Sequence, residues 1–117
     1  MIRRGAGSSK PAPLVLFLCQ QSAEKALKGL LIWIRGDFAR THVITALLAE
    51  LRSADPAVAD ELRGAAALDA YYQSTRYPDA LGGAVPATTF QLEEATLGIG
   101  RAKSVLEVVG RELAERT

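Results

Sequence analysis

Cysteine and histidine are almost absent from this sequence, since each occurs once, as Cys19 and His42. A single cysteine excludes a disulfide within the chain, and one cysteine with one histidine argues against a Cys/His zinc site. The sequence also lacks the glycine-rich phosphate loops of common nucleotide enzymes and a pair of histidines at metal-ligand spacing. We therefore expect no metal and no cofactor.

An excess of charge of one sign is also absent. Lys and Arg together number 14 and Asp and Glu 13, which gives a net charge of +1. Proteins that coat long nucleic acids usually carry a strong basic excess, so this class is excluded. A small site for one nucleotide, or a groove shared by two subunits, remains consistent with this balance.

Long hydrophobic runs are missing as well. The apolar run at residues 14–19 follows Arg3, Arg4 and Lys10, but it is shorter than the ~7–15 residues of a signal-peptide core. Bulky Leu18 also stands before Cys19, where cleavage needs a small residue. No stretch approaches the ~18 apolar residues of a membrane span. We expect a cytoplasmic protein that does not enter a membrane.

The periodicity of apolar residues predicts an all-α fold. Residues 1–13 are rich in Gly, Ser and Pro and are expected to be flexible, while residues 14–117 form the helical domain. Helices are predicted at about 14–34, from an N-cap at Thr41 to about 51, at about 58–72 and at about 89–115. Sustained strand alternation is missing, so we expect an up-and-down bundle of about four helices.

The last predicted helix carries a seven-residue apolar repeat. Apolar residues alternate by three and four positions along it: Leu92, Ala95, Ile99, Ala102, Leu106, Val109 and Leu113. This pattern predicts a seam that packs against another helix. Gly98 and Gly100 interrupt the helix and indicate close approach or a local bend. Such a seam leaves more apolar surface than one short chain covers, which predicts a homodimer.

Two groups of polar residues are candidates for a site. Gln21, Glu24, Lys25 and Lys28 share one face of the first helix, and spacing alone favours a solvated face over a ligand cleft. His42 is the single side chain that titrates near neutral pH without perturbation, but its position just after the predicted Thr41 cap favours a simple role at a helix start. Neither pattern by itself proves a site.

The segment after residue 68 combines aromatic and charged residues. All three tyrosines, Tyr71, Tyr72 and Tyr77, lie there with Arg76, and Asp69 and Asp79 flank them. Arg offers a planar fork for phosphate, and tyrosine rings offer stacking faces for a base. The alternative is structural, with the rings anchoring the loop at 74–86 while Asp69 pairs with Arg76. Both roles are compatible.

Four of these pieces, in order, resemble the HEPN domain family of prokaryotes. They are Gln20–Lys28, Thr41-His42, Leu68-Asp69 with Tyr71-Tyr72, and Thr75–Ala80. The resemblance covers residues 17–113 and implies a dimeric helical bundle with both polar groups near a cleft. It implies pairing with a minimal nucleotidyltransferase, often as a toxin–antitoxin module. Some branches are metal-independent ribonucleases, marked by an Arg and a His separated by four to six residues.

The chain departs from the family pattern in three ways. The family's first helix is shortened or lost, because a Gly/Ser/Pro segment precedes Leu14. Val43 follows His42 where the family usually has Asp. The ribonuclease signature is missing from the last helix, although Arg35 and His42 meet its literal spacing elsewhere in the chain.

Three functions follow as hypotheses. The first is a nucleotide- or RNA-binding module that acts with a nucleotidyltransferase, its ligand-binding residues being Gln21, Glu24, Lys28, His42, Asp69, Tyr72, Arg76, Tyr77 and Asp79. The second is a metal-independent endoribonuclease with His42 and Arg35 as catalytic residues. The third is a structural dimer without a ligand.

Overall fold

The computed structural model of this protein describes residues 11–38, 40–72 and 92–117. In these ranges the regular elements are α1 (Pro11–Arg35), α2 (Ile44–Ala54), α3 (Pro56–Glu61), the 3₁₀ segment η2 (Arg63–Asp69) and α6 (Leu92–Arg116). All of them are helical, which confirms the predicted all-α bundle. None of the described helices is both long enough and apolar enough to cross a membrane.

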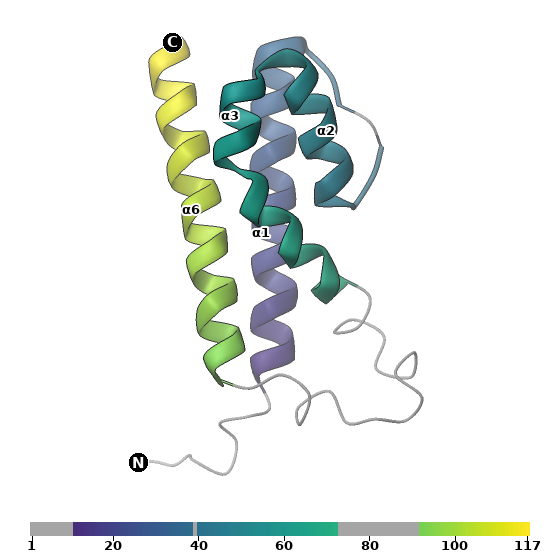
Figure 1. The fold of residues 1–117 in the computed structure, drawn as a ribbon, viewed down its shortest axis with the longest axis vertical. Helices are drawn as coiled ribbons and strands as arrows, with labels where there is room; N and C mark the ends of the chain where they lie inside the picture. The colour runs from purple at the N-terminus through teal and green to yellow at the C-terminus, as the bar shows by residue number, and fades with distance from the viewer. Residues whose placement is uncertain (1–10, 39, 73–91) are drawn as a thin grey trace.

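The two long helices, α1 and α6, lie side by side and run in the same direction (Figure 1). The chain returns between them through α3 and η2, and α2 packs against α1 and α3. The core is built from apolar side chains that α1 and α2 bury completely, among them Leu16, Leu27, Leu30, Leu47 and Leu51. Helix α1 is therefore the central element, and every polar group buried on it must find a partner within the bundle.

Helix α1 is longer than predicted. It begins at Pro11, so Pro11 and Pro13 lie in its first turn, where proline is tolerated because the N–H groups there lack helical partners. Its end matches the predicted break: the Gly36 N–H bonds the Ile32 carbonyl at 2.8 Å, with a positive φ of 89° at Gly36. That conformation is the common glycine ending of a helix.

The predicted N-cap of the second helix is wrong. Helix α2 begins at Ile44 and the cap residue is Val43, while the Thr41 hydroxyl accepts the Val43 N–H at 3.0 Å. The first N–H groups of α2 are satisfied from another element. Asp69, at the end of η2, accepts from the N–H groups of Ile44 at 2.7 Å and Thr45 at 2.9 Å. The prediction failed because the capping side chain, Asp69, is 24 or more positions away, and an N-cap is predicted from the residues next to the helix start.

The third predicted helix is divided. A short α3 ends at Glu61, and η2 continues as a 3₁₀ helix. A 3₁₀ helix has three residues per turn, so its buried face recurs every third residue. The buried residues of η2, Ala65 and Leu68, follow that period, and Leu62 before it and Tyr71 after it continue the interval of three. A regular α-helix over 58–72 would place Ala66, Asp69 and Tyr72 on the same face as Leu62 and Ala65, whereas they lie only partly buried to one side.

The predicted seam of α6 is half right. Ala95, Ala102 and Val109 face the bundle, whereas Leu92, Ile99 and Leu106 are 76%, 46% and 49% exposed. The inward face is completed by residues outside the predicted set: Gly98, Val105 and Glu112. The repeat identified a packed helix, but only one side of it faces the bundle, so Leu92, Ile99 and Leu106 are left at the surface while Leu113 is partly buried.

Candidate functional site

A buried carboxylate lies at the centre of the most polar cluster in the described structure. Glu24, on the middle of α1, has no exposed side-chain surface. Its Oε2 atom accepts from Lys28 Nζ at 2.7 Å and lies 3.0 Å from His42 Nδ1. Its Oε1 atom accepts from the amides of Gln21 at 3.2 Å and Gln20 at 3.5 Å. Both oxygens are therefore fully used.

The charge state of Glu24 follows from these partners. Burial by itself raises the pKa of the carboxyl, but hydrogen bonds from Lys28 and His42 outweigh that effect, and the pKa lies below its usual value. Glu24 is consequently ionised at neutral pH. An ionised carboxylate can only accept, so the proton of a neutral His42 ring resides on Nδ1. The Nε2 atom then presents a lone pair.

The backbone before α2 is held against α1 by a second buried side chain. Gln20 is fully buried, and its amide donates to the carbonyl of His42 at 2.9 Å. Gln21 in turn donates to Gln20 Oε1 at 2.8 Å. Gln20 and Glu24, four positions apart on α1, thus fix the backbone and the ring of His42 respectively. The position of the imidazole is set by the bundle and not by its own local segment.

The imidazole itself is accessible, with 62% of the His42 side chain exposed. One face of the ring stacks on Tyr72, with centroids 5.4 Å apart and planes 10° apart. Tyr72 also contacts Phe17 of α1, at 6.1 Å between centroids. Lys28 Nζ lies 5.2 Å from the centre of the Phe38 ring. The cluster thus presents an oriented imidazole, an ammonium and aromatic rings at one surface, which we call the His42 cluster.

Five of the predicted site residues meet in this cluster: Gln21, Glu24, Lys28, His42 and Tyr72. The solvated-face interpretation of the polar stripe is wrong for Glu24, because that side chain is buried, and it holds for exposed Lys25. The helix-start interpretation of His42 is also wrong, since α2 begins two residues later.

Other predicted residues lie elsewhere. Arg35 pairs with Asp37 at 2.9 Å and Glu50 at 3.0 Å. The hydrogen bond to Asp37 raises the pKa of the Arg35 guanidinium. The hydrogen bonds of Arg35 go to these two carboxylates, and none joins it to His42 in the described residues. The Asp69 carboxylate accepts hydrogen bonds from the first N–H groups of α2. Arg76, Tyr77 and Asp79 lie outside the described residues, as does the proposed pairing of Asp69 with Arg76.

Sequence reasoning missed Gln20 and Phe38 as members of the cluster. Gln20, Glu24 and Lys28 follow one another at intervals of four, which places them on one helical face. That spacing was the available signal for Gln20. Phe38 follows the end of α1 and carries no pattern, so its place beside Lys28 depends on the path of the chain after Gly36.

The described residues contain no candidate metal site. No group of three or more His, Cys, Asp or Glu side chains there is arranged to hold a metal ion. The arrangement suits recognition of a nucleotide, because the Lys28 ammonium can approach a phosphate, His42 Nε2 can accept from a ribose hydroxyl and the aromatic rings can contact a base. An oriented imidazole with a free Nε2 can also move a proton.

Comparison with protein-family models matches the HEPN domain to residues 6–113. No curated protein and no solved structure matched the chain. The matched range includes every described helical element except the last three residues of α6. The chain therefore belongs to the HEPN domain family, which supports a nucleotide- or RNA-related role.

Proposed function

We propose that this protein is a nucleotide- or RNA-binding module whose ligand docks on the His42 cluster. The observation that carries the proposal is the buried, ionised Glu24, which orients an exposed imidazole from a distant segment. Burying a carboxylate is unfavourable unless each oxygen is paired. A fold that needed only stability would gain as much from an apolar residue there, so the polar arrangement favours a ligand site.

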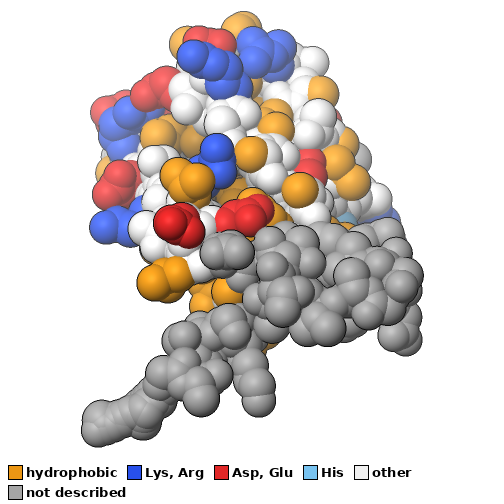
Figure 2. All heavy atoms as spheres, turned by 60° about the horizontal axis from the view of Figure 1, so that its bottom comes forward, with side chains coloured by type: hydrophobic (Ala, Val, Ile, Leu, Met, Phe, Trp, Pro, Cys, Tyr) orange, Lys and Arg blue, Asp and Glu red, His pale blue; other side chains and the backbone are white. Residues whose placement is uncertain are grey.

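The ligand contacts follow from the hydrogen-bonding groups, charge and aromatic surface of the cluster that remain accessible. His42 Nε2 can accept from a ligand hydroxyl, and Lys28, which is 17% exposed, brings a positive charge to the surface for a phosphate. Tyr72 already stacks on His42 and extends the aromatic surface. On the face shown in Figure 2, Lys and Arg side chains lie among Asp and Glu side chains and do not form one basic region. This distribution favours local recognition over coating of a long polymer.

We further propose that the protein works as a homodimer. Between α1 and α6 lies an apolar groove of about 260 Å³, lined in part by Leu18, Ile99 and Leu106, each about half exposed. Leu14 and Leu92 extend the same apolar character toward the starts of these helices. A second copy of the chain, offering the same leucines, would bury this surface. Sedimentation as a monomer at micromolar concentration would contradict the dimer.

The natural context of such a dimer is a minimal nucleotidyltransferase, in a toxin–antitoxin pair. We propose this partner because the resemblance to the HEPN family implies it. Arg35, one catalytic candidate, is committed to two carboxylates. Co-purification of the two proteins expressed together would support the partnership, and independent elution would count against it.

A metal-independent endoribonuclease is the second candidate, and the orientation of His42 favours it. Nε2 would take the 2′-hydroxyl proton while a cation stabilises the charged phosphorane. Arg35 is engaged, so exposed Arg40, two residues before His42, or Arg76 would have to supply that charge. A purely structural dimer is the third candidate, and it predicts no effect of the cluster on any ligand.

One assay separates these candidates. A labelled single-stranded RNA and a labelled nucleotide are each incubated with the full chain in EDTA, with and without the nucleotidyltransferase, and both binding and cleavage are measured. Lys28→Gln should weaken binding, while Lys25→Gln removes the same charge from the exposed side of α1 and should not. Cleavage lost in His42→Ala supports the nuclease. Equal behaviour of all variants supports the structural dimer.

A further inference from the structure

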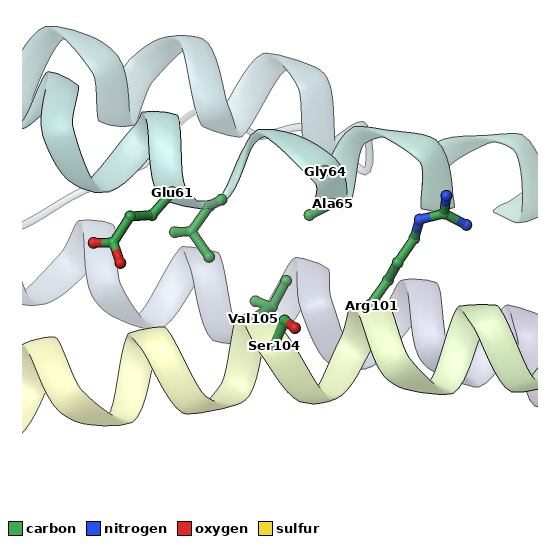
Figure 3. Close-up of a pocket in the computed structure, with 7 residues that line it drawn as sticks. Glu61, Gly64, Ala65, Arg101, Ser104 and Val105 are labelled. Carbon is green, nitrogen blue, oxygen red and sulfur yellow. The ribbon is translucent and has the colours of Figure 1, made fainter.

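A second cavity lies on the opposite side of η2, between that segment and α6. Its volume is about 170 Å³, and it is lined by Glu61, Leu62, Gly64, Ala65, Arg101, Ser104 and Val105 (Figure 3). The space exists because the 3₁₀ turn presents only small residues there. A Cβ added to Gly64 would meet no atom within 4 Å. The cavity belongs to a different surface from the His42 cluster, since Tyr71 bonds Glu94 of α6 while Tyr72 stacks on His42.

Two charged side chains line this cavity, Glu61 and Arg101, and they differ in their partners. Arg101 makes no hydrogen bond and no ion pair within the described part of the chain, although it is only partly exposed. Two carboxylates on the surrounding elements have other hydrogen-bond partners. Glu61 is held by Arg111 through two bonds, at 2.6 and 3.1 Å, and Glu94 accepts the Tyr71 hydroxyl at 2.6 Å. Arg101 is thus the charged lining residue without an ion-pair partner in the described ranges.

The remaining lining completes a mixed site. Figure 3 shows Arg101 extending from α6 toward η2 at one end of the cavity and Glu61 at the other end. Ser104, one helical turn after Arg101, has a hydroxyl without a hydrogen-bond partner in the described ranges. Leu62 and Val105 are buried and form an apolar wall. A guanidinium and a hydroxyl beside an apolar wall match an oxyanion attached to a short apolar group.

We propose that this cavity binds a small organic oxyanion, a carboxylate or a phosphate ester, with its charged group on Arg101 and Ser104. A volume near that of a cavity that holds benzene limits the ligand to roughly six to ten non-hydrogen atoms. The short stem would lie against Leu62 and Val105. The site is independent of the His42 cluster, so either can fail without the other.

The test uses the isotope-labelled full chain and three probes: butyrate, inorganic phosphate and butanol, against sodium chloride at equal ionic strength. Saturable shifts of the amide signals of Gly64, Ala65 and Ser104 with butyrate but not butanol assign a carboxylate. Saturation with phosphate instead assigns a phosphate group. No saturable shift with either anion overturns the proposal.

Two variants secure the assignment. Arg101→Gln should weaken anion binding by about tenfold or more, because it removes a charge-assisted hydrogen bond. Ser104→Ala should weaken it by a smaller factor. Lys103→Gln loses the same charge from the same helix outside the cavity and should leave binding unchanged. Shifts that survive Arg101→Gln, in a variant with an unchanged circular dichroism spectrum, would place the anion elsewhere and refute the site.

Discussion

The contact between α1 and α6 at Gly98 predicts opposite outcomes for two neighbouring glycine substitutions. A Cβ placed on Gly98 would lie 2.5 Å from Cδ2 of Leu16, which is completely buried. Carbon atoms in van der Waals contact are about 3.5–4.0 Å apart. Either Leu16 or the helix must therefore move, in an interior packed as densely as an organic crystal. At Gly100, by contrast, the added Cβ meets nothing within 4 Å.

The magnitudes follow from two terms. Each Gly→Ala change gains about 1 kcal/mol of helix propensity. Gly98→Ala also pays an overpacking penalty of about 1–3 kcal/mol, so its net effect runs from neutral to a destabilisation of about 2 kcal/mol. Gly100→Ala keeps the gain and should stabilise. Since the propensity gain is common to both, the difference between the two variants isolates the packing penalty.

The assay is urea denaturation of both variants beside the unmodified protein, followed by circular dichroism at 222 nm. We expect Gly98→Ala to be less stable than Gly100→Ala by about 1–3 kcal/mol. For a domain of this size that difference corresponds to a melting-temperature gap of several degrees, about 3–6 °C per kcal/mol. Equal stabilisation by both substitutions would refute the close approach of α1 and α6 at Gly98.

Three further predictions concern single side chains. Asp69→Ala should destabilise the fold by about 2 kcal/mol because it uncaps α2, whereas Asp37→Ala, on an exposed pair, should change stability by less than about 1 kcal/mol; similar losses would contradict the capping role. Burial, with a hydrogen bond to Glu94, raises the pKa of Tyr71 from 10.0 to about 12. Its contribution to the free energy of unfolding is therefore complete below pH 10 and is lost as the pH rises to about 12, a dependence that Tyr71→Phe should remove in alkaline denaturation. Burial raises the pKa of the Cys19 thiol, so a disulfide reagent should label it quickly only in urea, and rapid labelling of the folded protein would contradict its burial.

Local periodicity predicted most of the fold. The apolar residues of α1 and α2 recur at helical spacing, and both helices formed where that spacing predicted them, within about three residues. The third helix was harder to predict because its geometry changes from an α-helix in α3 to a 3₁₀ helix in η2. Around η2, residues 62, 65, 68 and 71 are buried at an interval of three, which indicates 3₁₀ geometry. A search at the α-helical period alone does not separate the two.

The site was predictable only in part, because its defining property is non-local. Glu24 lies on a face with Lys28 that looks solvated in isolation. It is buried because His42, 18 positions later, is brought back across α1 and because Gln20 anchors that segment. The periodicity of apolar residues within a helix does not show which distant segment will pack against it. For the same reason Asp69 was considered for a ligand or for Arg76, whereas its carboxylate is used on the first turn of α2.

The central claim, that ligand binds at the His42 cluster, is best tested by the imidazole signal itself. Because the chain has one histidine, its Cε1 proton gives a single assignable resonance in a proton spectrum. Titration of the full chain in EDTA with a short single-stranded RNA, and separately with a nucleotide, should shift that resonance saturably. Binding detected by anisotropy while the His42 resonance stays fixed would place the ligand elsewhere and contradict the account.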